Sequence, residues 1–167
     1  MKKRLLIAMA ACCCACAKPV GTLMIVNIGT EALTGTANDT AFTVRPGKAW
    51  SLATTPVGEQ TVTVGDAALH VTITEGMTTV VEPSGTGCFV VADFQRQYGG
   101  TPSPEVVIDE RFERKKTFTL QHPLLVAFGR KLPTRIPEGT AARRLHSVDC
   151  ELLRDKNRLS ESLARLP

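Results

Sequence analysis

The chain has 167 residues, with 20 Lys and Arg against 16 Asp and Glu, and its formal net charge is +4 at pH 7. Lys2, Lys3 and Arg4 supply most of that excess, so the rest of the chain is nearly neutral and nucleic acid is not expected as a partner. If the basic N-terminal segment is removed as part of a short leader, enough residues remain for one domain with a hydrophobic core or for two very small domains.

Residues 1–17 have the pattern of a secretory leader. Lys2, Lys3 and Arg4 form a basic head, and the following residues up to Ala17 are uncharged and end in small side chains. The apolar run is too short to cross a bilayer as a helix, which needs about 20 residues. We therefore expect an exported protein.

Four of the six cysteines lie between Cys12 and Cys16. Cys12, Cys13 and Cys14 are adjacent, and no second cysteine or histidine pair follows at ligand spacing, so no metal site is expected. The small, apolar context resembles a bacterial lipoprotein signal, in which one cysteine is lipidated and becomes the new N-terminus. Cys16 is the predicted lipidation site, and Cys12 is the alternative. Cleavage after Ala17 would instead give a soluble secreted protein, because Ala15-Cys16-Ala17 fits the A-x-A pattern.

The lipoprotein resemblance implies a location as well as a modification. It implies a protein held on the periplasmic or outer surface of a membrane by its N-terminal lipid, which is the first partner that we expect.

Residues 18–83 are rich in Thr and Val and predict a β-sandwich module. Fifteen of the twenty threonines lie between Thr22 and Thr86, and branched side chains suit a pleated sheet. The apolar run 23–28 predicts a buried strand. The segments 61–64, 69–74 and 77–81 predict three more strands, separated by turns such as Gly65-Asp66. Strands spaced about ten residues apart indicate an antiparallel sandwich or a small barrel.

Two motifs in this half carry a family resemblance. The run PVGEQTVTVG at 56–65, with EGMTTVV at 75–81, resembles small bacterial surface β-sandwich modules of the PEGA or prealbumin-like kind. The resemblance covers about residues 22–83. It implies adhesion or spacing rather than catalysis, and it provides no catalytic residues.

Residues 84–149 predict further strands, either in the same domain or in a second small unit that begins near 84–87. The apolar run 88–94 predicts a buried strand, and 106–108 and 117–120 predict two shorter ones. Between these two lies a basic segment, expected as a solvated loop, with binding to anionic lipid or cell-wall polymer as the alternative. Its cations are Arg111, Arg114, Lys115 and Lys116.

Residues 150–166 predict a C-terminal amphipathic helix, which makes the fold mainly β, and α+β overall. Its leucines recur at helical spacing, and Asp149 is expected to cap its first turn. These leucines are Leu152, Leu159, Leu163 and Leu166.

Cys88 and Cys150 are the two cysteines beyond the leader. Two cysteines in an exported protein are expected to pair as a disulfide, which here would join the C-terminal helix to the strand at 88–94. The alternative is two buried free thiols that pack as small hydrophobic groups.

The sequence contains no catalytic motif, and neither an enzyme nor a cofactor is expected. Asp93 is notable because it interrupts an apolar run, and we expect it to pair with Arg96 or Arg111. The other titratable candidates are His70, expected on a solvated strand face, and His122, His146, Asp109, Glu110 and Asp149.

Trp50 and Tyr98 are the residues that could stack a ligand through a ring with a polar group, so Trp50 is the candidate for a binding groove.

Taken together, these patterns predict an exported, lipid-anchored structural or interaction module of the cell envelope, whose partner is an envelope protein or the cell wall. The first alternative is a periplasmic ligand-binding domain, and the second is a secreted enzyme of unidentified type.

Overall fold

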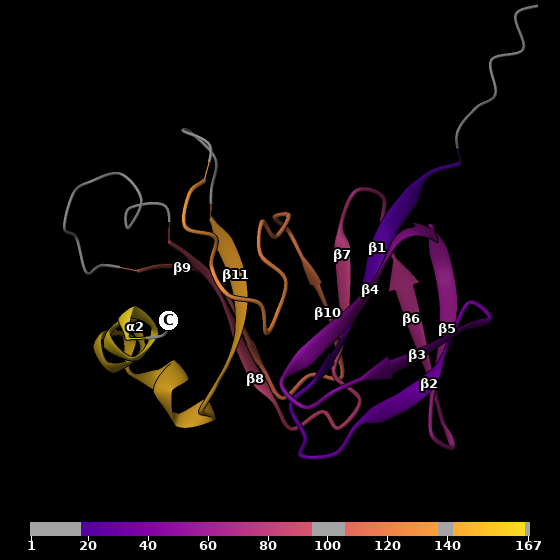
Figure 1. The fold of residues 1–167 in the computed structure, drawn as a ribbon, viewed down its shortest axis with the longest axis horizontal. Helices are drawn as coiled ribbons and strands as arrows, with labels where there is room; N and C mark the ends of the chain where they lie inside the picture. The colour runs from indigo at the N-terminus through magenta and orange to yellow at the C-terminus, as the bar shows by residue number, and fades with distance from the viewer. Residues whose placement is uncertain (1–17, 95–105, 137–141, 166–167) are drawn as a thin grey trace, which may run out of the picture.

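The computed structural model describes residues 18–94, 106–136 and 142–165, and these residues form a mainly β structure with short helices at the C-terminal end (Figure 1). The predicted fold class is confirmed, and the described sheets are open rather than closed into a barrel. The elements are β1 (Val20–Asn27), β2 (Leu33–Ala37), β3 (Thr40–Val44), β4 (Lys48–Pro56), β5 (Gly58–Val64), β6 (Ala67–Ile73), β7 (Thr78–Val81), β8 (Cys88–Asp93), β9 (Val107–Glu113), β10 (Thr117–Leu120), β11 (Arg143–Val148), the 3-10 helix η1 (Cys150–Arg154) and α2 (Lys156–Ala164).

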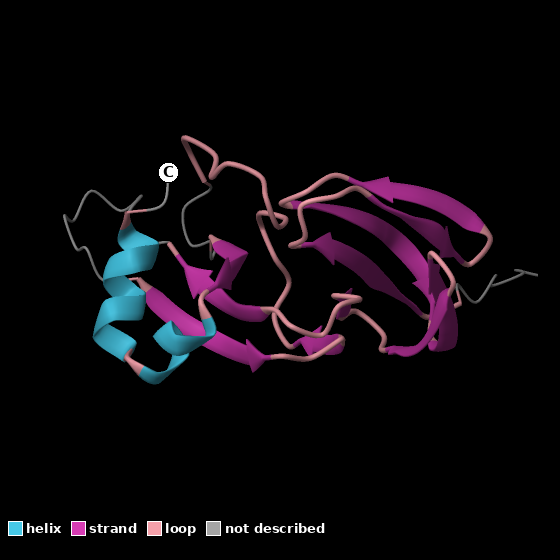
Figure 2. Ribbon diagram, turned by 90° about the horizontal axis from the view of Figure 1, so that it is seen from below, coloured by secondary structure: helices cyan, strands magenta, loops and turns pink. Residues whose placement is uncertain are grey.

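The strands form three sheets that follow one another along the long axis of the molecule. The outer sheet has the order β3-β2-β5-β6, the central sheet β10-β7-β1-β4, and the distal sheet β11-β8-β9. Figures 1 and 2 show the helices at the end that carries the distal sheet. The central sheet is therefore covered on both faces by other sheets.

Residues 23–26 of β1 are all apolar because both faces of the strand are buried there. Leu23 and Ile25 belong to the core shared with the outer sheet, and Met24 and Val26 belong to the core shared with the distal sheet. A strand covered on one face alternates apolar and polar residues, whereas a strand covered on both does not. The run 23–28 therefore forms the buried strand that the sequence predicted.

β8 repeats this arrangement one layer further along. Phe89 and Val91 face the central sheet, whereas Val90 and Ala92 face the C-terminal helix and pack with Leu159 and other apolar residues. The apolar run that begins at Cys88 is thus explained by burial on both sides.

The central sheet joins the two halves of the chain. β7 pairs with β1 in parallel, an exception among mainly antiparallel sheets, and β10 pairs with the other edge of β7. β10 comes from the second half of the sequence, and its Phe118 and Leu120 lie in the same core as Met24. Residues 18–83 therefore share a sheet and a core with residues that follow them.

The link between β7 and β8 is fixed by a buried carboxylate. Glu82 is 2% exposed, and its Oε1 accepts hydrogen bonds from the backbone N and the Oγ of Ser84 at 2.9 and 2.6 Å. Its Oε2 accepts from the backbone N of Thr86 at 3.1 Å and of Gly87 at 3.2 Å. A buried carboxylate needs such donors. The position near 84–87 at which the sequence allowed a domain boundary is therefore a hydrogen-bonded loop.

The C-terminal helix is shorter than predicted, and the expectation of one helix from residue 150 is wrong. Asp149 accepts from the backbone N of Glu151 at 3.0 Å and caps η1 rather than α2. Asp155 has extended backbone angles, and its Oδ1 accepts from the backbone N of Asn157 and Arg158, both at 3.1 Å. Asp155 thus ends η1 and begins α2, because its carboxylate competes for helical amides.

The leucine stripe of this helix packs as predicted within the described residues. Leu159 and Leu163 are fully buried, Leu152 is partly buried, and Leu166 lies outside the described ranges. In the described ranges, no helix has the length and apolar character to cross a membrane.

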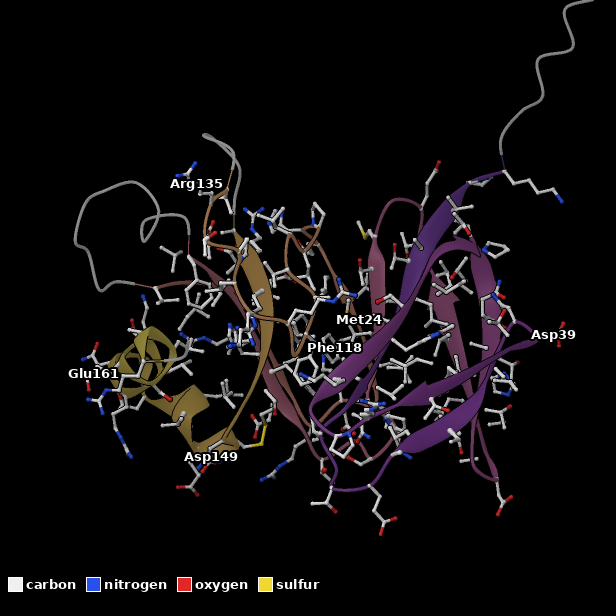
Figure 3. The ribbon with its side chains drawn as sticks, viewed as in Figure 1. Met24, Asp39, Phe118, Arg135, Asp149 and Glu161 are labelled. Atoms are coloured by element: carbon white, nitrogen blue, oxygen red, sulfur yellow. A yellow bond between two sulfur atoms is a disulfide. The ribbon has the colours of Figure 1, made fainter. Side chains whose placement is uncertain are left out.

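Cys88 and Cys150 form the disulfide that the sequence predicted. Their sulfur atoms lie 2.01 Å apart and their Cα atoms 5.2 Å apart. Figure 3 shows the bond beside Asp149, at the lower end of the distal sheet. The bond joins the first residue of β8 to the first residue of η1. The predicted lipidation sites Cys12 and Cys16 lie outside the described residues.

Candidate functional site

The four predicted cations of the basic segment do not form one loop. β9 extends through Glu113, so Arg111 is a strand residue, and its Nη1 donates to the carbonyl of Leu153 in η1 at 3.2 Å. Arg114, Lys115 and Lys116 occupy the exposed turn between β9 and β10. The predicted loop boundary at Arg111 is wrong, because Ile108, Glu110 and Phe112 alternate with exposed residues as one edge strand.

Trp50 is half-buried in β4 rather than displayed on the surface. Its ring centroid lies 5.2 Å from that of Phe42, and it packs against the core between the central and outer sheets. This environment explains the tryptophan as a packing residue. Tyr98, the other stacking candidate, lies outside the described residues.

The three histidines lie on separate elements. His70 is exposed on β6, as predicted, and its Nδ1 lies 3.5 Å from Oγ1 of Thr61 in the neighbouring strand. His122 is exposed after β10. His146, expected on a charged approach to the helix, is instead a buried residue of β11 and is 4% exposed.

His146 lies in an apolar environment. Its ring centroid is 5.3 Å from that of Phe94, and its Nε2 is buried without a hydrogen-bond partner in the described part of the chain. Burial, with a smaller contribution from the neighbouring Arg144 guanidinium, lowers the pKa of His146 to about 4. Burial also lowers the pKa of Arg144. His146 is therefore neutral at pH 7, and it has the environment of a core residue.

The acidic candidates are held by structural contacts. Asp109 accepts from Nε of Arg143 at 2.6 Å, and Oε2 of Glu110 accepts from the backbone N of Gln121 at 3.3 Å. Asp93 is half-buried at the end of β8, less enclosed than its apolar neighbours suggest. Of its two expected partners, Arg111 donates to Leu153, and Arg96 lies outside the described residues.

Among the described residues, no group of three or more histidine, cysteine and acidic side chains could hold a metal ion.

One basic groove was not predicted from the sequence. It lies in the long connection between β10 and β11, has a volume of about 400 Å³, and carries the exposed cations Arg130, Lys131 and Arg135 over an apolar floor. Within the described ranges, none of these three cations makes an ion pair. The floor consists of Leu125, Val126, Ala127, Pro133 and Ile136. We call this feature the basic groove.

The first part of the basic groove is anchored at two points, Val126 and Gly129. The backbone N of Val126 donates to the carbonyl of Arg143 at 3.1 Å, which ties the floor to β11. Gly129 has a φ of +72° and packs so closely on Gly47 that any side chain would collide with that backbone. Nζ of Lys48 donates to the Gly129 carbonyl at 2.9 Å. The sequence signal was the spacing of three cations between Gly129 and Pro137, with no acidic residue among them.

A second groove of about 560 Å³ lies between β9 and α2. Val106, Ile108 and Ala164 form its apolar part. Its polar lining comes from Lys156, Asn157, Ser160, Glu161 and Arg165. Mixed charge distinguishes this groove from the basic groove.

Comparisons of the chain with protein-family models, with curated proteins and with solved structures each found no match.

Proposed function

We propose that this chain is an exported, lipid-anchored module of the cell envelope that acts by binding. The observation that carries the proposal is the disulfide between Cys88 and Cys150. Disulfides form and persist in oxidising compartments and are rare in the cytosol. The disulfide therefore supports the export that residues 1–17 predict, and Cys16 is the cysteine that we expect to carry lipid.

The basic groove gives this module a binding surface. Arg130, Lys131 and Arg135 are exposed and free of ion pairs among the described residues, so they can meet an anionic partner without first breaking internal contacts. The resemblance to PEGA or prealbumin-like modules points the same way, because such modules mediate adhesion or spacing.

The test is an intact-mass analysis of the protein from its native membrane fraction, alone and with single substitutions. We expect acylated Cys16 as the first residue. A Cys16→Ala variant should lose membrane fractionation, whereas Cys12→Ala, the matched control, should keep it. Acylation of Cys12 instead would make that residue the anchor, and the expected membrane fractionation of the two variants would then be reversed.

Two other results would contradict the proposal. An unmodified N-terminus at Lys18 would make the protein a soluble secreted domain, and an intact Met1 would remove the argument for export.

The same spectra test the second candidate function, a periplasmic ligand-binding domain. The groove between β9 and α2 favours it, because about 560 Å³ lies within the size range of small-molecule sites. A co-purifying small molecule would support it.

A further inference from the structure

Three exposed apolar side chains gather where the described chain begins. Val20, Val57 and Met77 are 38%, 40% and 36% exposed. Val57 donates its backbone N to the carbonyl of Pro19 at 3.3 Å, and Thr22 donates to the carbonyl of Met77 at 2.8 Å. Hydrogen bonds thus hold the start of β1, the β4–β5 turn and the β6–β7 turn together. We call Val20, Val57 and Met77 the apolar tip.

The apolar tip is close in the chain to the predicted lipid. Cys16 lies four residues before Val20, and an extended chain reaches at most about 14 Å over that length. A lipid on Cys16 would therefore hold the apolar tip at the surface of the bilayer. Exposed apolar side chains at that depth gain free energy by entering the headgroup region.

The basic groove lies on the same side of the molecule as the apolar tip. Figure 1 shows β1 starting at the upper edge, with the β4–β5 and β6–β7 turns beside it, and Figure 3 places Arg135 at that edge. The turn with Arg114, Lys115 and Lys116 lies at the opposite edge. It follows Glu113, which pairs with Cys88 beside the disulfide, and Figure 3 shows that bond near Asp149.

We propose that the apolar tip and the basic groove form one membrane-facing side that rests on the anionic surface of the bilayer. The tip enters the headgroup region, and Arg130, Lys131 and Arg135 bind lipid phosphates. The proposal rests on the lipid anchor of the proposed function. It adds an orientation, in which the helices and the outer sheet stand side by side above the membrane and the disulfide points away from it.

The first experiment measures depth in the bilayer. Lipidated protein with Val57→Cys is labelled with a fluorophore and reconstituted into phosphatidylglycerol vesicles that contain a nitroxide-labelled lipid as quencher. The matched control is Glu31→Cys, because Glu31 is also exposed but follows the end of β1 that lies at the edge opposite the apolar tip. We expect quenching at position 57 to exceed that at position 31 by roughly fivefold, since quenching requires contact with lipid.

Equal quenching at the two positions would overturn the proposal while leaving the anchor intact. Failure to obtain acylated protein, read by mass before labelling, would instead overturn the proposed function. The two failures are therefore distinguishable.

The second experiment tests the cations with a charge-matched control. Arg130→Gln, Lys131→Gln and Arg135→Gln are combined in one variant, and Arg114→Gln, Lys115→Gln and Lys116→Gln in another with the same loss of charge. Quenching at position 57 should fall at least twofold in the first variant and stay unchanged in the second. In vesicles of phosphatidylcholine alone, which carry no net charge, the protein with all three cations of the basic groove should show the same fall in quenching at position 57.

If the first variant loses binding to purified cell-wall polymer but keeps its quenching, the basic groove serves the wall, and the proposed contact with lipid phosphates is overturned.

Discussion

At the scale of single residues, the buried His146 makes the stability of the folded protein depend on pH. It is neutral in the folded protein, with a pKa of about 4, whereas the unfolded chain has the ordinary value of 6.5. Between these values the unfolded state binds the proton more strongly than the folded state does. The contribution of the neutral His146 ring to the free energy of unfolding is therefore complete above pH 6.5 and is lost as the pH falls toward 4.

We therefore predict that the free energy of unfolding decreases on acidification by up to about 3 kcal/mol through this residue. The measurement is urea unfolding between pH 7.5 and 4, with His146→Phe as the reference, since phenylalanine suits the contact with Phe94 and does not titrate. The difference between the two proteins should change with pH. A constant difference would show that His146 has an ordinary pKa.

At the scale of elements, the join between η1 and α2 depends on one carboxylate. Asp155 holds the first amides of α2, and the helix then buries Leu159 and Leu163 against β8. η1 is tied to β8 by the disulfide, whereas α2 depends on its cap and on these apolar contacts. α2 is thus expected to open more easily than the strands it covers.

Replacing the cap should loosen α2 alone. Asp155→Ala removes the acceptor for Asn157 and Arg158 and should cost about 1 kcal/mol, which corresponds to about fivefold faster amide exchange in α2. Asp155→Ser keeps an acceptor and should retain most of the protection. Faster exchange in β1 to the same extent would contradict a local effect and indicate global destabilisation.

The elements also show how far the sequence could predict the fold. β1 and β8 were predictable because double burial makes a continuous apolar run, and the turn at Gly65-Asp66 separates β5 from β6 as expected. The parallel pairing of β1 with β7 was not predictable, because it depends on contacts between strands far apart in the chain.

Charged strands were the main failure. β9 contains four charged residues, three of them consecutive, but its Ile108 and Phe112 lie on its more buried positions. β11 begins with Arg143 and Arg144 and yet buries Leu145 and His146. In β9 the alternation is present in the sequence, but the charges obscure it. In β11 two consecutive residues are buried, so burial was decided by the neighbouring layers. The basic groove was missed for a related reason, since its apolar floor exists only after the connection folds onto β11.

At the scale of the whole molecule, the disulfide closes a large loop. Cys88 and Cys150 are 62 residues apart in sequence, and the loop between them contains β9, β10 and β11. β10 belongs to the central sheet, so the bond restrains part of that sheet as well as the distal sheet. Restricting such a loop in the unfolded chain favours folding.

The double variant Cys88→Ser/Cys150→Ser should lose about 4 kcal/mol of unfolding free energy, on the loop-entropy model for a loop of this size. Denaturant unfolding of both proteins, with and without a reductant, measures it. Reduced wild-type protein should match the variant, and the reductant should leave the variant unchanged. Equal stability of the oxidised protein and the variant would rule out this contribution.

The position of β10 in the central sheet also bears on synthesis. The ribosome releases β1 and β7 early, but β10 begins 36 residues after β7 ends. Until it arrives, one edge of β7 has unpaired backbone groups, and Met24 and Val26 lack the partners that cover them. Such a half-built sheet readily joins other chains. The edge of β7 is therefore open to pairing with other chains during this interval, and β10 is the segment that closes it.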